Sequence, residues 1–182
     1  MTVIPRLTIF LSLLVMLSSC EFHCSVGNTA ERKDKKNAVM QDGAALYNNI
    51  RVKTNQVTLK QAYLADKLTG EEIGEGNFVN MKNGVKLVLL IDKGWTEVNG
   101  RVFIGASLKA TADNGSTILD EPDLFKTYEA EGIKLSDSKL LGLSMYFTEW
   151  SVTRPVTIDV LFKVWDKKGE GTIEGSYRVH TK

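Results

Sequence analysis

The chain has 182 residues, 43% of them apolar and 25% charged, which is the composition of an ordinary globular protein. Its 23 basic and 22 acidic residues give a formal net charge of +1, so the sequence lacks the strongly basic character typical of nucleic-acid-binding domains. The length suits a single domain with appended segments.

The N-terminal segment has the three successive parts of a secretory signal. Met1–Arg6 carries one basic side chain, residues 7–17 are almost entirely apolar, and two serines follow. The apolar run is too short to cross a bilayer as a helix, which takes about 20 residues. We therefore predict a signal peptide over residues 1–19, after which the chain has 22 basic and 22 acidic residues and no net charge.

An aliphatic residue and two small residues precede the first of two cysteines, in the order Leu17-Ser18-Ser19-Cys20. This segment resembles the lipobox of bacterial lipoproteins, in which the signal is cut before the Cys and its thiol is joined to diacylglycerol. The resemblance implies a lipid anchor on Cys20, which would hold the protein in the cell envelope, at the outer membrane and facing the periplasm or the cell surface. An ordinary secretory signal with Cys20 near its cleavage site is the alternative.

The second cysteine, Cys24, follows His23. A lipidated Cys20 cannot pair with Cys24, which leaves Cys24 as an odd thiol outside the cytoplasm. No second pair of metal ligands accompanies them in the sequence, so we expect neither a redox nor a metal site here, and no cofactor elsewhere.

Residues 20–46 predict a tether. The stretch GNTAERKDKKNA is polar and charged and has no apolar periodicity, which favours a flexible segment. The stretch NAVMQDGAALY at its end predicts a short helix at the entrance to the domain, which we place at residues 47–182.

From Tyr47 onward the pattern predicts β-strands separated by turns. Val85–Ile91 is an apolar run of strand length, and the alternation over residues 101–113 predicts another strand, joined to Thr117–Leu119 through a turn at Asp113-Asn114-Gly115. Further strands are expected around Val57–Leu59 and Ala62–Leu64, in residues 141–147 and 158–164, and in a last strand, after the loop Asp166–Gly171, that turns Ile173, Tyr177 and Val179 inward.

One stretch breaks the strand pattern. Residues 120–132 have Pro122 early, apolar residues at helical spacing and Gly132 at the end, which predicts a short helix or helical turn that crosses from one sheet to the other.

About seven short strands with few helices predict an all-β fold, an antiparallel β-sandwich. Residues 94–125, which include the run LDEPDLF, and residues 164–177, with the turn WDKKG, resemble a group of small bacterial lipoproteins with an immunoglobulin-like sandwich. The resemblance implies location and fold and brings no catalytic residues with it.

Catalytic motifs are missing from the sequence. It has no Gly-x-Ser-x-Gly and no His-Glu-x-x-His, and His180 is expected on the solvated side of the last strand. A cluster of acidic residues could supply oxygen ligands to Ca²⁺, although turn and helix-start roles explain them better: Asp113, Asp120, Glu121 and Asp123.

Three tryptophans are candidate ligand contacts: Trp95, Trp150 and Trp165. Alternation places Trp165 on the solvent side of its strand, where Trp offers a large contact area with few rotatable bonds. Packing of Trp165 beneath a loop is the alternative.

The sequence thus favours a non-enzymatic binding or interaction module, anchored to the membrane by lipid, with a protein partner in the cell envelope and no nucleic acid. The alternatives are a glycan- or small-ligand-binding component of a nutrient-uptake system and an accessory subunit of an envelope enzyme.

Overall fold

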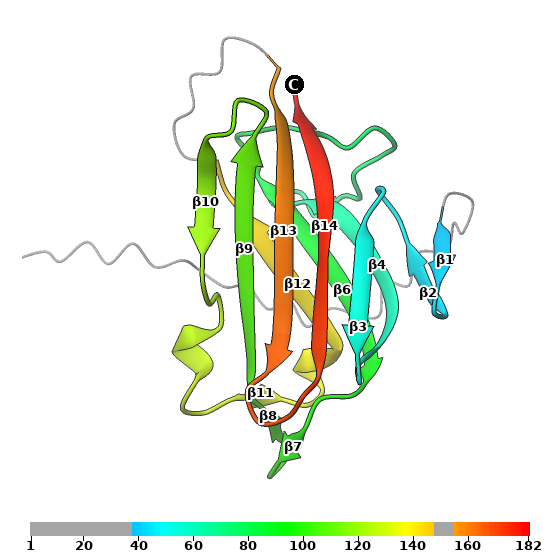
Figure 1. Cartoon of the computed structure of the whole chain (residues 1–182), viewed down its shortest axis with the longest axis vertical. Coiled ribbons are helices and arrows are strands. Elements are labelled where there is room, and N and C mark those ends of the chain that lie inside the picture. Colours follow the sequence, from blue (N-terminus) through cyan, green and yellow to red (C-terminus); the bar gives the residue numbers. More distant parts are fainter. Residues whose placement is uncertain (1–37, 148–154) are drawn as a thin grey trace, which may run out of the picture.

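The computed structural model describes residues 38–147 and 155–182. This part of the chain forms two large β-sheets packed face to face, with a small third sheet at one end (Figure 1). Its helical content is limited to two short 3₁₀ helices. The expected all-β class and the sandwich of mainly antiparallel sheets are therefore confirmed.

The five-stranded sheet has the strand order β1-β2-β4-β6-β12. Its strands are β1 (Val39–Gln41), β2 (Ala44–Leu46), β4 (Thr58–Asp66), β6 (Val85–Lys93) and β12 (Leu140–Met145). Neighbours are antiparallel except for β2 and β4.

The six-stranded sheet has the order β10-β9-β13-β14-β3, and the short strand β5 pairs with the end of β14. Its strands are β3 (Arg51–Asn55), β5 (Phe78–Val79), β9 (Ile104–Ala112), β10 (Thr117–Glu121), β13 (Thr157–Asp166) and β14 (Thr172–Thr181).

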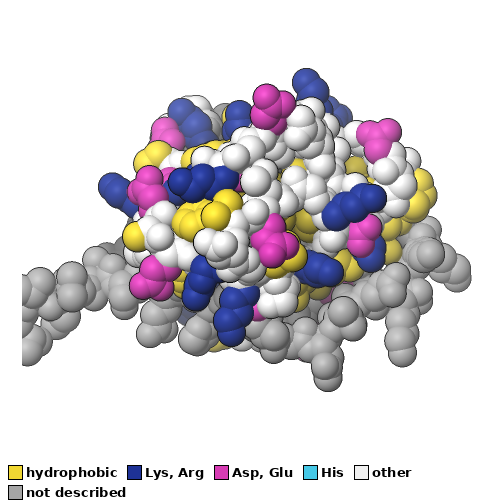
Figure 2. All heavy atoms as spheres, turned by 90° about the horizontal axis from the view of Figure 1, so that it is seen from below, with side chains coloured by type: hydrophobic (Ala, Val, Ile, Leu, Met, Phe, Trp, Pro, Cys, Tyr) yellow, Lys and Arg dark blue, Asp and Glu magenta, His cyan; other side chains and the backbone are white. Residues whose placement is uncertain are grey.

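The third sheet consists of β7 (Glu97–Val98), β8 (Arg101–Val102) and β11 (Ile133–Lys134) and closes one end of the sandwich. Seen from that end, basic and acidic side chains are interspersed around a few exposed apolar ones (Figure 2). This end therefore offers no concentration of one charge.

One hydrophobic core fills the space between the two large sheets. Leu87 and Leu89 of the five-stranded sheet and Val160 and Val164 of the six-stranded sheet are fully buried in it. Each such side chain stabilises the fold by about 1.5–3 kcal/mol relative to an exposed one. The strand period of two dictates which residues enter the core, and the inward sets predicted for β13 and β14 are confirmed.

The order of the strands is that of an immunoglobulin-like sandwich. The strands β4, β6 and β12 take the places of A, B and E, and β10, β9, β13 and β14 take those of C′, C, F and G. Chain-neighbouring strands such as β9 and β10 form hairpins, whereas the chain passes from one sheet to the other between β6 and β9 and between β10 and β12. This topology brings β9, β13 and β14 together as the middle of the larger sheet.

The entrance to the domain differs from the prediction. Where a short helix was expected at the end of the tether, β1 and β2 form a hairpin, and Ala44–Leu46 is buried in the five-stranded sheet. The turn between them is Asp42-Gly43, with φ of 49° and 82°. An Asp-Gly pair favours a two-residue hairpin turn because both positions require positive φ, and this local preference overrides the weak helical pattern. The ordered domain thus begins before residue 47.

The helical turn predicted in residues 120–132 is present as a 3₁₀ helix, η1 (Lys126–Tyr128). Gly132, with φ of 64°, donates its backbone N–H to the Tyr128 carbonyl oxygen at 2.7 Å and ends the turn. The segment joins β10 of one large sheet to β11 and then to β12 of the other, after a second 3₁₀ helix, η2 (Asp137–Lys139). The expected crossing between the sheets is confirmed.

Two asparagines connect the two large sheets where β14 lacks a neighbouring strand. Asn77 donates from its side-chain amide to the backbone oxygens of Arg178 and Asn48, at 2.8 and 2.7 Å. Asn48 donates its amide to Asn77 Oδ1 at 3.0 Å and accepts the Leu64 N–H of β4 at 2.9 Å. Both have positive φ, a conformation that Asn tolerates better than most residues.

We predict that Asn77→Ala lowers the free energy of unfolding by about 3 kcal/mol, because it leaves buried carbonyl groups unpaired and strains a residue with positive φ. Urea denaturation followed by circular dichroism measures the change. The control is Asn55→Ala, which removes an exposed hydrogen bond to the Glu170 oxygen and should cost under about 1 kcal/mol. Equal losses in both variants would contradict a special role for the asparagine pair.

Candidate binding surface

The side of the six-stranded sheet that faces away from the core is the candidate site, and we call it the outer face. The cross-strand register aligns its side chains in rows. One row runs Asp120, Lys109, Leu161, Ser176 and Arg51 across β10, β9, β13, β14 and β3. Strand alternation alone places each of these residues on the side opposite the buried valines and leucines.

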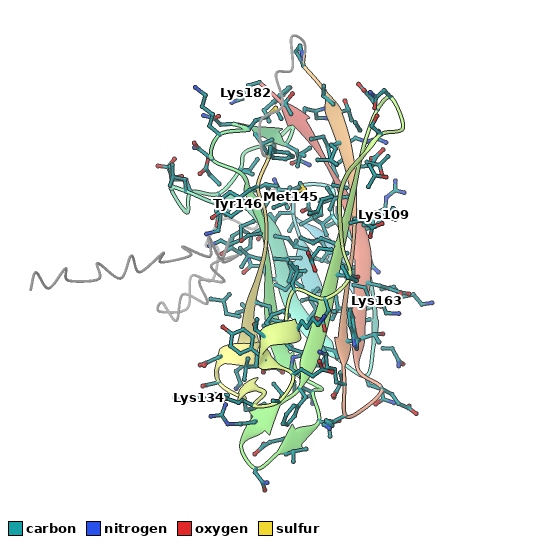
Figure 3. The ribbon with its side chains drawn as sticks, turned by 90° about the vertical axis from the view of Figure 1, so that its left-hand side faces the viewer. Lys109, Lys134, Met145, Tyr146, Lys163 and Lys182 are labelled. Carbon is teal, nitrogen blue, oxygen red and sulfur yellow. The ribbon has the colours of Figure 1, made fainter. Side chains whose placement is uncertain are left out.

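A second row lies beside the first and consists of Ser107, Lys163, Glu174 and Lys53. The two rows line a shallow depression of about 630 Å³. Two small residues, Ser107 and Ser176, lower its floor, while Lys109 and Lys163 project from the sheet at its border (Figure 3). Such a shape suits a flat or extended partner better than an enclosed small molecule.

An apolar side chain lies in the middle of this depression. Leu161 is 58% exposed, although the neighbouring β13 residues Val160 and Phe162 are buried in the core. Polar residues are expected on the solvated side of a sandwich strand. An exposed leucine surrounded by polar and basic side chains is the arrangement found at the centre of many binding surfaces, with an apolar middle and a charged rim.

The charge of the outer face is positive. It carries five cations, Arg51, Lys53, Lys109, Lys163 and Arg178, and three carboxylates, Asp120, Asp159 and Glu174. The carboxylates pair with Lys109 at 3.2 Å, Arg178 at 2.6 Å and Lys163 at 3.8 Å. Within the described part of the chain, no carboxylate forms an ion pair with Arg51 or Lys53, so these two cations remain available to an acidic partner.

At one end of the outer face the indole of Trp165 rests on Gly105. The two residues are cross-strand partners on β13 and β9, and Trp165 is half-buried. A Cβ atom at position 105 would overlap the Trp165 ring, so glycine is required for this close approach. Glycine at position 105 thus makes room for the indole on the solvent side of the sheet, where Trp165 stays partly exposed.

His180 lies at the other end of the same sheet, on the solvent side of β14 as predicted. Its Nδ1 is 3.0 Å from the Thr157 hydroxyl, and its ring centroid is 5.7 Å from that of Phe78, which is 53% exposed. The imidazole is therefore held by a cross-strand partner and a neighbouring ring rather than by a carboxylate.

The acidic residues considered as Ca²⁺ ligands are not brought together. Asp120 pairs with Lys109 on the outer face, Glu121 lies opposite Leu108 on the other side of β10, and Asp113 is beyond the far end of that strand. Asp123 accepts the Lys167 ammonium at 2.6 Å and the Phe125 N–H at 3.0 Å, which fixes the start of the helical turn. In residues 38–147 and 155–182 no group of three His, Cys, Asp or Glu side chains could hold a metal ion.

Of the other residues that the sequence suggested as sites, one is partly exposed to solvent and one is buried in the core. Trp95 is 8% exposed and belongs to the core, where Gly171 packs close to its ring, so it offers no surface to a ligand. Trp165 is on the solvent side of β13, as alternation predicts. Cys20, Cys24 and Trp150 lie outside the described residues.

Sequence reasoning assigned no role to Leu161 and Lys163, which share the side of β13 that carries Trp165. It missed Lys53, Arg51 and Gly105, because only the pairing of β3 with β14 and of β9 with β13 brings them alongside. The available signal was the repeated placement of Lys or Arg at outward positions of several strands.

Comparisons with protein-family models, with curated proteins and with solved structures find no match. Across the residues that the structure describes, no helix is long and apolar enough to cross a membrane.

We predict that Gly105→Val displaces the Trp165 indole and lowers the free energy of unfolding by about 1–3 kcal/mol through overpacking. Urea denaturation measures the loss, and the tryptophan emission spectrum should shift to longer wavelength as the ring enters water. Ser107→Val is the matched control, on the same face of the same strand, and should change stability by less than about 0.5 kcal/mol. An unchanged emission spectrum in the Gly105 variant would rule out the stacked arrangement.

Proposed function

We propose that the chain is a membrane-anchored, non-enzymatic lipoprotein of the cell envelope that binds an acidic protein partner through the outer face of its six-stranded sheet. The observation that carries the proposal is the combination of an exposed apolar centre, Leu161, with two cations on β3 of the same sheet, Arg51 and Lys53, that form no ion pair with any described carboxylate. The Leu17-Ser18-Ser19-Cys20 segment supports the anchor.

Two carboxyls on the surface of the domain are held in their charged form by ion pairs. The Lys60 ammonium hydrogen-bonds Asp92 and lowers the pKa of that carboxyl, and the Arg178 guanidinium does the same to the pKa of Asp159. Both carboxyls stay ionised at neutral pH, whereas a general acid of this type needs a raised pKa.

A glycan is the second candidate partner, favoured by the partly exposed Trp165 indole that packs on Gly105. Sugar rings pack against exposed aromatic faces, so this partner would depend mainly on Trp165. A protein partner centred on the depression would depend mainly on Leu161 and the two unpaired cations. Substitutions at these positions therefore separate the two partners.

We predict that a photo-crosslinking amino acid in place of Leu161, in the membrane-anchored protein, yields a defined protein adduct. The control places the same amino acid at Leu68, which is 75% exposed on a loop away from this surface. Replacing Arg51 and Lys53 by Glu together should reduce the adduct at least tenfold, because it reverses the charge at the β3 edge of the same surface.

Adducts of equal yield at positions 161 and 68, or an adduct indifferent to the charge reversal, would exclude the outer face as the protein-binding surface. Loss of binding to acidic polysaccharide in Trp165→Ala, with the charge-reversed variant unaffected, would favour the glycan partner instead.

We predict that the protein incorporates a clickable fatty acid in cells and that Cys20→Ala abolishes the label, because the thiol is the expected attachment point. Cys24→Ala is the control and should retain the label. A labelled Cys20→Ala protein, or an unlabelled unsubstituted protein, would reject the lipid anchor.

A further inference from the structure

The strand β3 ends the six-stranded sheet, and one of its two edges has no partner strand among the described residues. It pairs with β14 on one side, and the hairpin of β1 and β2 lies beyond the other (Figure 1). A strand offers backbone N–H and C=O groups to both sides in alternation, so an unpaired edge can accept a further strand.

The hydrogen bonds of β14 show which backbone groups of β3 face this free edge. On the side of β14 where β3 and β5 lie, the Arg178 carbonyl oxygen accepts the Asn77 amide at 2.8 Å, and the His180 N–H donates to the Asn77 carbonyl oxygen at 2.9 Å. Backbone groups alternate between the two sides of a strand. Glu174 and Ser176, in step with these two residues, therefore turn their backbone groups toward β3.

The register partners of those residues, Lys53 and Arg51, accordingly use their own backbone groups in the pairing with β14. The backbone groups of Val52 and Thr54, which alternate with them, point to the free edge. One of these groups has a partner, since Gln41 of β1 donates its side-chain amide to the Val52 carbonyl oxygen at 2.7 Å. A side-chain amide thus occupies a position that the N–H of a further strand could take.

A groove of about 330 Å³ follows the same edge. It lies between β3 and the hairpin of β1 and β2, and the start of β4 closes one end. Val52, Thr54, Ala44 and Leu59 are among the residues that line it, and Asp42 of the hairpin turn contributes a carboxylate. A strand added to β3 would turn every second side chain into this groove, where small apolar side chains fit and a second carboxylate would be repelled.

The remaining side chains of such a strand would lie on the outer face, across from Arg51 and Lys53. Directly opposed side chains on neighbouring strands have Cβ atoms about 4.5–5.5 Å apart, and opposite charges there attract each other. Both cations are exposed, and neither forms an ion pair with a carboxylate in the described part of the chain. A second copy of this chain fits the edge poorly, because two paired β3 strands would bring the cations of both copies together.

We propose that the acidic partner adds an extended segment to the free edge of β3, with acidic side chains beside Arg51 and Lys53 and small apolar side chains in the groove. The segment takes the place of the Gln41 amide at Val52 and bonds to Thr54 through its backbone. This inference rests on the proposed function, because it specifies how the same sheet recognises its acidic partner. Backbone hydrogen bonds give the affinity, while the groove and the two cations give the specificity.

Synthetic peptides test the added strand on the mature, membrane-extracted protein. The probe is a fluorescent peptide of alternating Glu and Val, and two further forms carry N-methyl groups on every Val or on every Glu. All three share the same side chains and charge, but in a strand only one set of residues bonds to β3. By fluorescence anisotropy, we expect one methylated form to bind at least tenfold more weakly than the probe and the other to bind within threefold of it. Equal affinities of all three peptides would overturn the added strand.

A substitution in β3 tests the same contact from the side of the protein. Thr54→Pro removes the N–H that points to the free edge and leaves the pairing with β14 in place, as proline does in edge strands. It should weaken binding of the unmethylated peptide at least tenfold, whereas Thr54→Val, the matched control, keeps the N–H and should bind within threefold of the unsubstituted protein. Circular dichroism checks that both variants are folded, and equal binding by two folded variants would contradict the proposal.

Amide hydrogen exchange, measured by NMR, shows whether the edge is open in the free protein. The Thr54 amide should exchange at least tenfold faster than the Lys53 amide, which bonds to β14, and should become protected when the peptide is added. Protection in the free protein at every concentration would show that the chain itself covers the edge. Protection that appears only at high protein concentration would show that a second copy does, and either result would overturn the proposal.

The Arg51→Glu and Lys53→Glu double variant separates this inference from the proposed function. If all three peptides bind equally and the double variant binds none, the acidic partner on the outer face is retained and the added strand is rejected. Binding of the unmethylated peptide that is indifferent to the double substitution, or absent at millimolar concentration, would overturn the acidic strand. Crosslinking from position 161 then decides the proposed function by itself.

Discussion

The reciprocal hydrogen bonds between Asn48 and Asn77 are the constraint on which the larger sheet depends. The strand β14 pairs with β3 through Ser176 and with β5 from His180, and the Asn77 amide holds the Arg178 carbonyl oxygen between these two stretches. Through Asn48 the same pair reaches Leu64 in the opposite sheet. A short polar link thereby satisfies the Arg178 carbonyl oxygen where β14 lacks a neighbouring strand, and it connects the two large sheets.

The fold was largely predictable because it follows from a strand period of two. The inward sets of β13 and β14, the hairpin of β9 and β10 and the helical turn near Lys126 were all expected from apolar alternation and turn residues. The hairpin at Asp42-Gly43 and the small strand pair around Asn99-Gly100 were missed. In both places a two-residue turn with positive φ dictates the structure while the flanking strands are too short to show a pattern.

The candidate site was less predictable, because its residues are brought together by the pairing of strands that are distant in the sequence and not by a local sequence motif. Alternation indicated that Trp165 faces solvent, but it could not show that Gly105 lies beneath it or that Arg51 shares a row with Leu161. The core position of Trp95 was equally hidden, since its loop gave no periodicity. Pairing between strands that are distant in sequence depends on topology, which local preferences leave open.

The contact of Trp165 with Gly105 also restricts how this protein can change over evolutionary time. A larger residue at position 105 is acceptable only if position 165 first loses its indole, and an indole at 165 keeps position 105 as glycine. Two sites far apart in the sequence are therefore inherited as a unit. Related chains that keep Trp at position 165 should also keep Gly at position 105. Chains without that Trp should tolerate larger residues at position 105.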